Sequence, residues 1–367
     1  MKRCIFKVIS VLLLMLLALS ACGPVDQNTD QIDSTDPVVD STDELTTEAT
    51  ITEVDTDEQA TTEEATTEAQ VTESTGIERP SKEVKKVLMV GNSFCYYYVE
   101  ELYGIAKAAG HEDFVVANLY ESGCPVADHW MWFLSNKSDM YQFYVTDKSG
   151  RNKIDSVTSL KDALAYDEWD VITYQQHFNP ERALDYDKAL KDTSTYAKNL
   201  FNRTRKDYPN ATLYWHQTWA YEVGYAMPEK YVEGEPVPKD ISIPDVETQT
   251  KSYETIKKVS QKVAKQNGVN LIPSGDAWQI ARADARVGDT MCKRTGKNGN
   301  LGDYYHDGDL GGGQYLNACV WYEVLFGESC IGNKWRPSYN LSEEKILALQ
   351  EAAHAAVAAV YGENYAK

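Results

Sequence analysis

Short apolar runs alternate along the chain with longer segments in which apolar residues recur every three or four positions. The short runs are typical of buried strands and the longer segments of amphipathic helices. The runs predict strands at 86–90, 114–119, 170–175, 212–217 and 269–273. The periodic segments predict helices at 98–109, 183–206, 246–267, 313–326 and 342–361. This alternation favours a flavodoxin-like three-layer α/β/α sandwich around a central five-stranded parallel sheet.

The segment 140–157 departs from this alternation. It holds two β-rich runs around the turn sequence Asp-Lys-Ser-Gly at 147–150, which predicts an inserted hairpin. In parallel sheets ligands bind beyond the carboxyl ends of the strands, so the loops after the five strands are where a functional site is expected.

Residues 1–22 are interpreted as a signal peptide. Lys2, Arg3 and Lys7 precede an apolar run that is shorter than the roughly 20 residues of a transmembrane helix. The run ends in Leu-Ser-Ala-Cys, which resembles the lipobox of bacterial lipoproteins. This resemblance implies a lipid on Cys22 and a protein anchored at the extracellular face of the cell envelope. The alternative is an ordinary cysteine within a signal peptide.

Residues 23–80 are rich in Thr, Glu, Asp and Ser and contain almost no aromatic side chains. Between 26 and 78 there are 17 carboxylates and no Lys or Arg, so this segment carries most of the net charge of −20. Such a composition predicts a disordered, extended acidic tether. Residues 81–367 form the predicted folded domain. No basic patch or zinc-like cysteine spacing points to nucleic acid as a partner.

The folded domain contains an odd number of cysteines, which cannot all pair with one another. Most are interpreted as buried thiols, and the sequence leaves open whether two of them form a disulfide. The five are Cys95, Cys124, Cys292, Cys319 and Cys330.

The loops after the predicted strands contain residue types that could act together in catalysis. Ser93 follows the first strand in a Gly-Asn-Ser turn, and Gly123 follows the second. A serine hydroxyl becomes nucleophilic when an imidazole accepts its proton and a carboxylate orients that imidazole. Asp303 and His306, three residues apart, are candidates for these two roles. A glycine N–H can stabilise the oxyanion of a tetrahedral intermediate. Each residue also has a structural alternative as a helix cap, a turn residue or part of a solvated loop.

In this order the stretches "VLMVGNSF", "ESGC" and "DYYHDGDLGGGQYLNA" resemble the blocks of SGNH hydrolases, the GDSL-like esterase superfamily. The resemblance implies Ser93 as nucleophile, His306 as base, Asp303 as its orienting group, and no cofactor or metal. It implies an oxyanion hole formed by the N–H groups of Ser93 and Gly123 together with an amide side chain.

The third block of that family departs from its usual form. The usual Gly-x-Asn-Asp is replaced by Gln-Gln-His-Phe-Asn-Pro at 175–180. A glutamine amide can donate to an oxyanion as asparagine does. Gln176 is therefore the favoured third donor and Asn179 the second candidate.

Aromatic and amide side chains gather near the predicted strand ends and suit the binding of sugar rings. His216 and Trp219 follow the fourth strand, and Trp130 follows the second. They are candidate substrate-binding residues, with a place in the hydrophobic core as the alternative.

The sequence therefore predicts a cell-surface serine esterase that removes short acyl groups, most simply acetate, from carbohydrate. One alternative is an inactive carbohydrate-binding lipoprotein on the same fold, which the altered third block keeps open. Another is a metal-dependent hydrolase that uses the oxygen-rich loop from Asp303 to Asp309.

Overall fold

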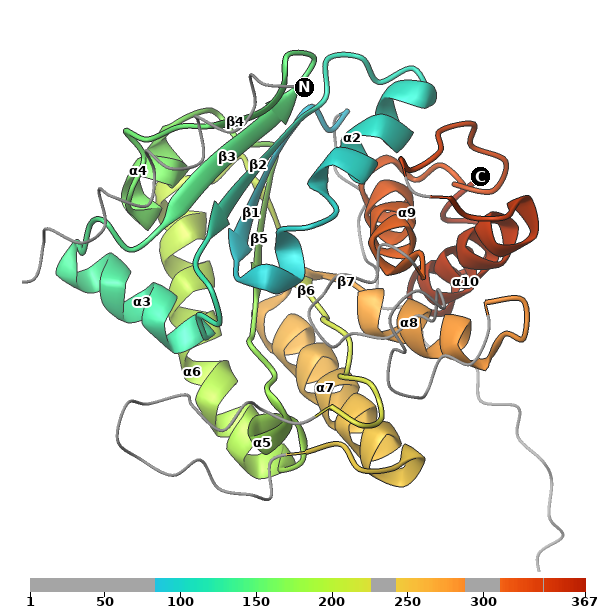
Figure 1. Ribbon diagram of the computed structural model, residues 1–367. Coiled ribbons are helices and arrows are strands. Elements are labelled where there is room, and N and C mark those ends of the chain that lie inside the picture. The colour runs from blue at the N-terminus through green and yellow to red at the C-terminus, as the bar shows by residue number, and fades with distance from the viewer. Residues whose placement is uncertain (1–82, 226–241, 288–310, 339) are drawn as a thin grey trace, which may run out of the picture. The chain divides into compact units, whose positions relative to one another are not determined.

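A computed structural model of the protein describes residues 83–225, 242–287, 311–338 and 340–367. All of these lie in the second of two units of the chain, Gln70–Lys367. Their centre is a seven-stranded sheet in the order β4-β3-β2-β1-β5-β6-β7 (Figure 1). Its strands are β1 (Lys86–Gly91), β2 (Val115–Tyr120), β3 (Gln142–Asp147), β4 (Gly150–Lys153), β5 (Val171–Gln175), β6 (Thr212–His216) and β7 (Asn270–Ile272).

The sheet is mixed rather than wholly parallel. Strands β2, β1, β5, β6 and β7 run parallel to one another. The predicted hairpin forms β3 and β4, and β3 pairs antiparallel with β2. The prediction of a five-stranded parallel sheet is therefore wrong in size, because the hairpin extends the sheet by two antiparallel strands at one edge.

Helices cover both faces of the sheet and bury a separate core on each (Figure 1). Successive strand residues point to opposite faces, so Val87 and Met89 join one core while Leu88 and Val90 join the other. The first core is closed by α2 (Val99–Ala108), α8 (Ser274–Ala283), α9 (Gly313–Phe326) and α10 (Glu343–Tyr361). The second is closed by α3 (Val126–Ser135), α4 (Leu160–Ala165), α5 (Pro180–Ala183), α6 (Tyr186–Asp207) and α7 (Val246–Asn267).

Side-chain caps explain where several of these helices begin. Asp185, Asp245 and Ser342 each accept a hydrogen bond from the backbone N–H three residues later, at the start of α6, α7 and α10. Helices α3 and α8 begin after Pro125 and Pro273, and neither has a side-chain cap. The sequence did not predict these two helices.

The four cysteines that the structure describes, Cys95, Cys124, Cys319 and Cys330, are free and buried. This confirms the interpretation as buried thiols for these four, while Cys292 lies outside the described residues. Within the described ranges, no helix is both long and apolar enough to cross a membrane.

Candidate active site

The turn after β1 presents Ser93 at the carboxyl edge of the sheet. The turn is formed by a short 3-10 helix, η1 (Ser93–Cys95), whose N-cap is Asn92. The Oδ1 atom of Asn92 accepts a hydrogen bond of 3.0 Å from the N–H of Phe94. Asn92 and Phe94 are fully buried, whereas Ser93 keeps 9% of its surface exposed. Ser93 is therefore the residue of this turn that a ligand can reach.

Two hydrogen bonds connect the loop after β2 to the end of β1 and the Ser93 turn. The Nδ2 atom of Asn92 donates to the carbonyl of Cys124 over 2.9 Å, and the N–H of Glu121 donates to the carbonyl of Gly91 over 3.1 Å. Between these two contacts lies Gly123, whose φ of 63° is in the left-handed region that favours glycine. The structure therefore brings the loops of Ser93 and Gly123 together, as the order of the sequence blocks implied.

The backbone N–H groups of Ser93 and Gly123 have no hydrogen-bond partner among the described residues. Most backbone donors in a folded protein are paired, so two neighbouring loops with unpaired N–H groups are a notable feature of this edge. Unpaired N–H groups beside a nucleophile are what an oxyanion hole requires.

Beneath the turn, buried side chains are linked by hydrogen bonds, and the donor and the acceptor of each bond can be assigned. Asn92 donates through Nδ2 and accepts through Oδ1, so its orientation is fixed. Gln175 must then donate its Nε2 to Asn92 Oδ1, at 2.7 Å, and its Oε1 accepts from Nδ1 of His216 at 2.8 Å. A Cβ on Gly91 would lie 2.6 Å from Cδ of Gln175, so glycine is needed for this close approach.

His216 completes this chain as a neutral imidazole. With its proton on Nδ1, Nε2 is left to accept from the hydroxyl of Ser274 at 3.0 Å. Full burial lowers the pKa of His216 to about 3. The His216 side chain is fully buried in this structure, which favours the alternative of a buried histidine over the predicted contact with substrate. The Ser274–His216 pair is equally sealed and is not a second nucleophilic centre.

The burial of His216 gives a testable dependence of stability on pH. Between its folded pKa of about 3 and the unfolded value near 6.5, the unfolded chain binds a proton that the folded protein does not. The free energy of unfolding should therefore fall as pH decreases through this window, by about 2 kcal/mol at pH 5 from this group alone. Urea unfolding of wild type at pH 7 and pH 5 measures the loss. His216→Gln should show a smaller difference between the two pH values.

Ser274→Ala is the matched control for this measurement. It removes the hydroxyl that contacts Nε2 of His216 but keeps the imidazole buried. Its stability should be lower than wild type at both pH values with a similar pH dependence. An unchanged difference between the two pH values in His216→Gln would contradict the assignment of a neutral histidine.

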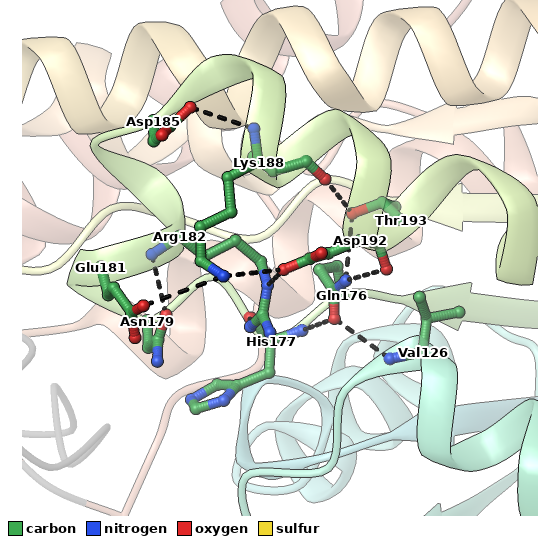
Figure 2. Close-up of polar contacts among 11 residues, drawn as sticks. Val126, Gln176, His177, Asn179, Glu181, Arg182, Asp185, Lys188, Asp192 and Thr193 are labelled. Carbon is green, nitrogen blue, oxygen red and sulfur yellow. Dashed lines mark hydrogen bonds and ion pairs between the residues drawn. The ribbon is translucent and has the colours of Figure 1, made fainter. Parts of the chain in front are cut away.

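The side chain of Gln176 makes hydrogen bonds to residues of α3 and α6 (Figure 2). Its Oε1 accepts from the N–H groups of Val126 at 3.0 Å and His177 at 2.8 Å. Its Nε2 donates to the carbonyl of Asp192 at 3.2 Å and to Oγ1 of Thr193 at 3.0 Å. Both amide hydrogens are used, so in this conformation Gln176 has none left for an oxyanion.

Asn179 serves as the N-cap of α5, where its Oδ1 accepts from the N–H of Arg182 at 3.0 Å (Figure 2). In the same stretch, the ring of His177 lies beside the Ser93 turn, with its centroid 6.2 Å from that of Phe94. Figure 2 shows this imidazole pointing away from the contacts of Gln176. In the third sequence block, Gln176 and Asn179 thus make structural hydrogen bonds, and His177 places a half-buried ring near Ser93.

The two tryptophans predicted to bind substrate differ in how far they are buried. Trp219 is buried, its ring stacked on Trp278 at 4.7 Å with the edge of Phe94 at 4.6 Å. It belongs to the hydrophobic core, which is the alternative that the sequence left open for this residue. Trp130 is half-buried on α3 and stacks on Phe133 at 6.0 Å. Only the role predicted for Trp130 is compatible with its exposure.

The remaining predicted site residues, Asp303 and His306, lie outside the described residues, as does Cys22. The oxygen-rich loop of the metal alternative lies there as well. Among the residues that the structure does describe, no cluster of three or more His, Cys, Asp or Glu side chains could hold a metal ion.

Sequence reasoning missed two groups of residues near the site. One is the buried chain formed by Asn92, Gln175 and Ser274 with His216. The other is a set of half-buried tyrosines that begins at Tyr96, three residues after Ser93. The run of three tyrosines at 96–98, directly after the Ser93 turn, was a visible signal for the second group.

A family model described as "Domain of unknown function (DUF4886)" matches residues 86–356, which is most of the chain. The chain belongs to the DUF4886 family. A crystal structure of a DUF4886 family protein from Bacteroides uniformis has a similar fold, with a TM-score of 0.59 and 28% sequence identity. That similarity covers 76% of this chain and 96% of the other. No curated protein matches the sequence.

Two further solved structures resemble this DUF4886 protein more distantly. A putative GDSL-like lipase from Parabacteroides merdae has a TM-score of 0.39 and 12% identity, over 66% of this chain and 96% of the other. Phospholipase A1 from Streptomyces albidoflavus has a TM-score of 0.34 and 12% identity, over 66% of this chain and 98% of the other.

Proposed function

We propose that this DUF4886 protein is a serine esterase with Ser93 as its nucleophile. The observation that carries the proposal is the arrangement at the carboxyl edge of the sheet. A reachable serine begins a helical turn, and the side chain of Asn92 links the loops of Ser93 and Gly123 by a hydrogen bond. The N–H groups of these two residues have no partner within the part of the chain that the structure describes. A nucleophile beside two free N–H donors suits attack on an ester carbonyl.

The proposed reaction has two halves. Ser93 Oγ attacks the ester carbonyl carbon while its proton passes to His306, and the N–H groups of Ser93 and Gly123 stabilise the oxyanion. The C–O bond to the alcohol then breaks, and the alcohol leaves with the proton from His306. Water repeats the sequence, giving the free carboxylic acid and restoring Ser93. Asp303 orients His306 throughout, and both assignments rest on the Asp-x-x-His sequence pattern. No step requires a cofactor.

We propose short acyl esters on carbohydrate, acetyl esters above all, as substrates. The support is the sequence of the N-terminus, which resembles that of a lipoprotein, and the acidic tether at 23–80. In this proposal a lipid on Cys22 anchors the protein at the extracellular face of the cell envelope, where carbohydrate polymers are at hand. The membrane is contacted only through that lipid, and nucleic acid is not a partner.

A screen of esters tests the proposed activity. Wild type and Ser93→Ala would be assayed on aryl esters of increasing acyl length and on acetylated and deacetylated glycans. We expect release of acetate by wild type and none by Ser93→Ala. Binding of a glycan without hydrolysis of any ester would support the inactive carbohydrate-binding alternative. Activity that is lost in EDTA and survives in Ser93→Ala would support the metal-dependent alternative.

A truncation tests the predicted start of the folded domain. Removing residues 1–80 should give a soluble protein with unchanged kcat, because the removed segment lacks apolar area for a core. Val84 is buried, and the N–H groups of Lys85 and Lys86 donate to Asp170 at 2.9 and 3.0 Å. Removing residues 1–90 also deletes all of β1 except Gly91 and should abolish folding. Thermal unfolding of the two proteins measures the contrast, and an unfolded shorter truncation would move the domain boundary toward the N-terminus.

A further inference from the structure

Three half-buried tyrosines and an arginine pack together near the nucleophile; we call Tyr96, Tyr120, Tyr144 and Arg151 the tyrosine–arginine cluster. The Arg151 guanidinium lies 4.1 Å from the ring centroid of Tyr96 and 4.7 Å from that of Tyr144. The Tyr96 ring lies 4.4 Å from Tyr120 and 5.4 Å from Tyr144. Cation–π contacts of this kind hold the guanidinium plane in one orientation.

The cluster adjoins both loops of the proposed active site. Tyr96 follows the nucleophile in the same turn, and its N–H donates to the carbonyl of Ser93 at 3.2 Å. Tyr120 is the last residue of β2 and precedes the loop of Gly123. A substrate bound at Ser93 therefore has this half-buried aromatic surface as its neighbour.

Arg151 has donors that lack an acceptor. Its Nε and Nη2 atoms are buried and have no hydrogen-bond partner among the described residues. Its ion pair is with Glu100 through Nη1, at 3.9 Å, and the Glu100 side chain is 63% exposed. Nε–H and Nη2–H form one edge of the guanidinium fork, which suits a pair of oxygen acceptors. Buried donors without acceptors are costly, so a polar ligand that supplied oxygens here would gain affinity.

Arg151 of this cluster also lines a groove of about 600 Å³ between α2, the β3–β4 hairpin and Trp335. This volume is within the range of roughly 300–1,000 Å³ of small-molecule sites. Its lining includes Arg151, Glu100, Tyr103, Lys107, Glu112 and Trp335.

Trp335 forms a rigid aromatic wall of the groove. Its ring is stacked on buried Tyr315, with centroids 6.0 Å apart and an angle of 14° between the planes. It lies so close to α2 that a Cβ on Gly104 would be 2.0 Å from its Nε1 atom. The glycine thus lets the indole approach the helix backbone.

We propose that this groove binds sugar units of an oligosaccharide beyond the acylated unit held at Ser93. The proposal rests on the proposed esterase function and specifies its substrate as an oligosaccharide. The charged side chains of the lining are two cations and two carboxylates, which together suit a neutral ligand rich in hydroxyl groups. Arg151 and Lys107 would donate to sugar oxygens, Glu100 and Glu112 would accept from hydroxyls, and Trp335 would pack on a ring face.

Kinetics on substrates of increasing length test the groove. The probes are 4-nitrophenyl acetate and O-acetylated xylo-oligosaccharides of one to four units. For wild type, KM should fall as the chain lengthens. Arg151→Gln should raise KM for the tetrasaccharide by about tenfold, the loss expected for charge-assisted hydrogen bonds, which is a larger factor than its effect on KM for 4-nitrophenyl acetate. Lys107→Gln, an exposed position on α2, should raise the same KM and provides a variant whose folding is not in question.

Lys153→Gln is the matched control. Lys153 lies on β4 two residues from Arg151, pairs with Asp155 at 2.9 Å and does not line the groove. It should leave every KM unchanged. Equal KM values for one and four units in wild type, or unchanged KM values in both groove variants, would overturn the proposal.

The groove and the esterase function can fail separately. If wild type hydrolyses none of these esters, the proposed function fails. Calorimetry with unmodified xylotetraose and the Ser93→Ala protein then tests the groove independently of catalysis. Binding that weakens in Ser93→Ala/Arg151→Gln and not in Ser93→Ala/Lys153→Gln supports the groove, and no heat of binding in Ser93→Ala overturns it.

Discussion

Alanine at Ser93 or at His306 is expected to lower kcat by roughly 10³- to 10⁶-fold, because each change removes one member of a unit that acts only as a whole. The Ser93→Ala/His306→Ala double variant should be little slower than either single variant. Initial rates on the best ester from the screen measure these losses. Ser274→Ala, at a serine buried beside His216, is the control and should retain most of wild-type kcat.

Losses that add on a logarithmic scale would show that Ser93 and His306 do not act as one unit. A His306→Ala protein with wild-type kcat would show that His306 is not the base for Ser93. The Asp-x-x-His pattern would then not mark catalytic residues in this protein.

Gln176→Ala is expected to destabilise the protein by about 3 kcal/mol, since it removes an amide that makes four hydrogen bonds, two of them buried and two part-buried. Its kcat should stay within several-fold of wild type at a temperature where it is folded. Urea unfolding and steady-state kinetics on the same preparation separate the two effects.

Asn179→Ala and His177→Ala complete this comparison of the third block. Asn179→Ala should cost about 1 kcal/mol of stability, as expected for a lost N-cap, with kcat unchanged. A loss of kcat of about 10²-fold or more in Gln176→Ala, with KM and stability unchanged, would instead assign the third oxyanion donor to Gln176. The same loss in His177→Ala would assign it to the ring that lies beside the Ser93 turn.

The positions of the parallel strands along the chain could be predicted from the sequence, because buried parallel strands are short continuous apolar runs. The position of the hairpin in the sheet could not be predicted. A turn between two β-rich runs predicts a hairpin, but its pairing with β2 depends on contacts that the local pattern does not record. Helices α3 and α8 were missed for another reason, since both begin after a proline without a side-chain cap.

The sequence could predict which loops form the candidate site, but not which side chains of those loops face it. Strand ends predicted that Ser93 and Gly123 lie together, because parallel strands share one carboxyl edge. The choice between neighbouring glutamines was not predictable, since successive residues of a strand point to opposite sides. Gln175 faces Asn92 and His216, whereas Gln176 faces α6 and the start of α3. A strand-end aromatic such as Trp219 can likewise enter the core, and only the fold decides.

The assignment of Ser93 as nucleophile is tested most directly by covalent labelling. A fluorophosphonate reacts with an activated serine and displaces fluoride, so the adduct adds the phosphonyl group to one oxygen atom. Intact-mass and peptide mass spectrometry of the labelled full chain should show a single adduct on Ser93, absent in Ser93→Ala and strongly slowed in His306→Ala. A wild-type protein that takes up no probe, or one labelled at another residue while Ser93 stays unmodified, would contradict the proposed function.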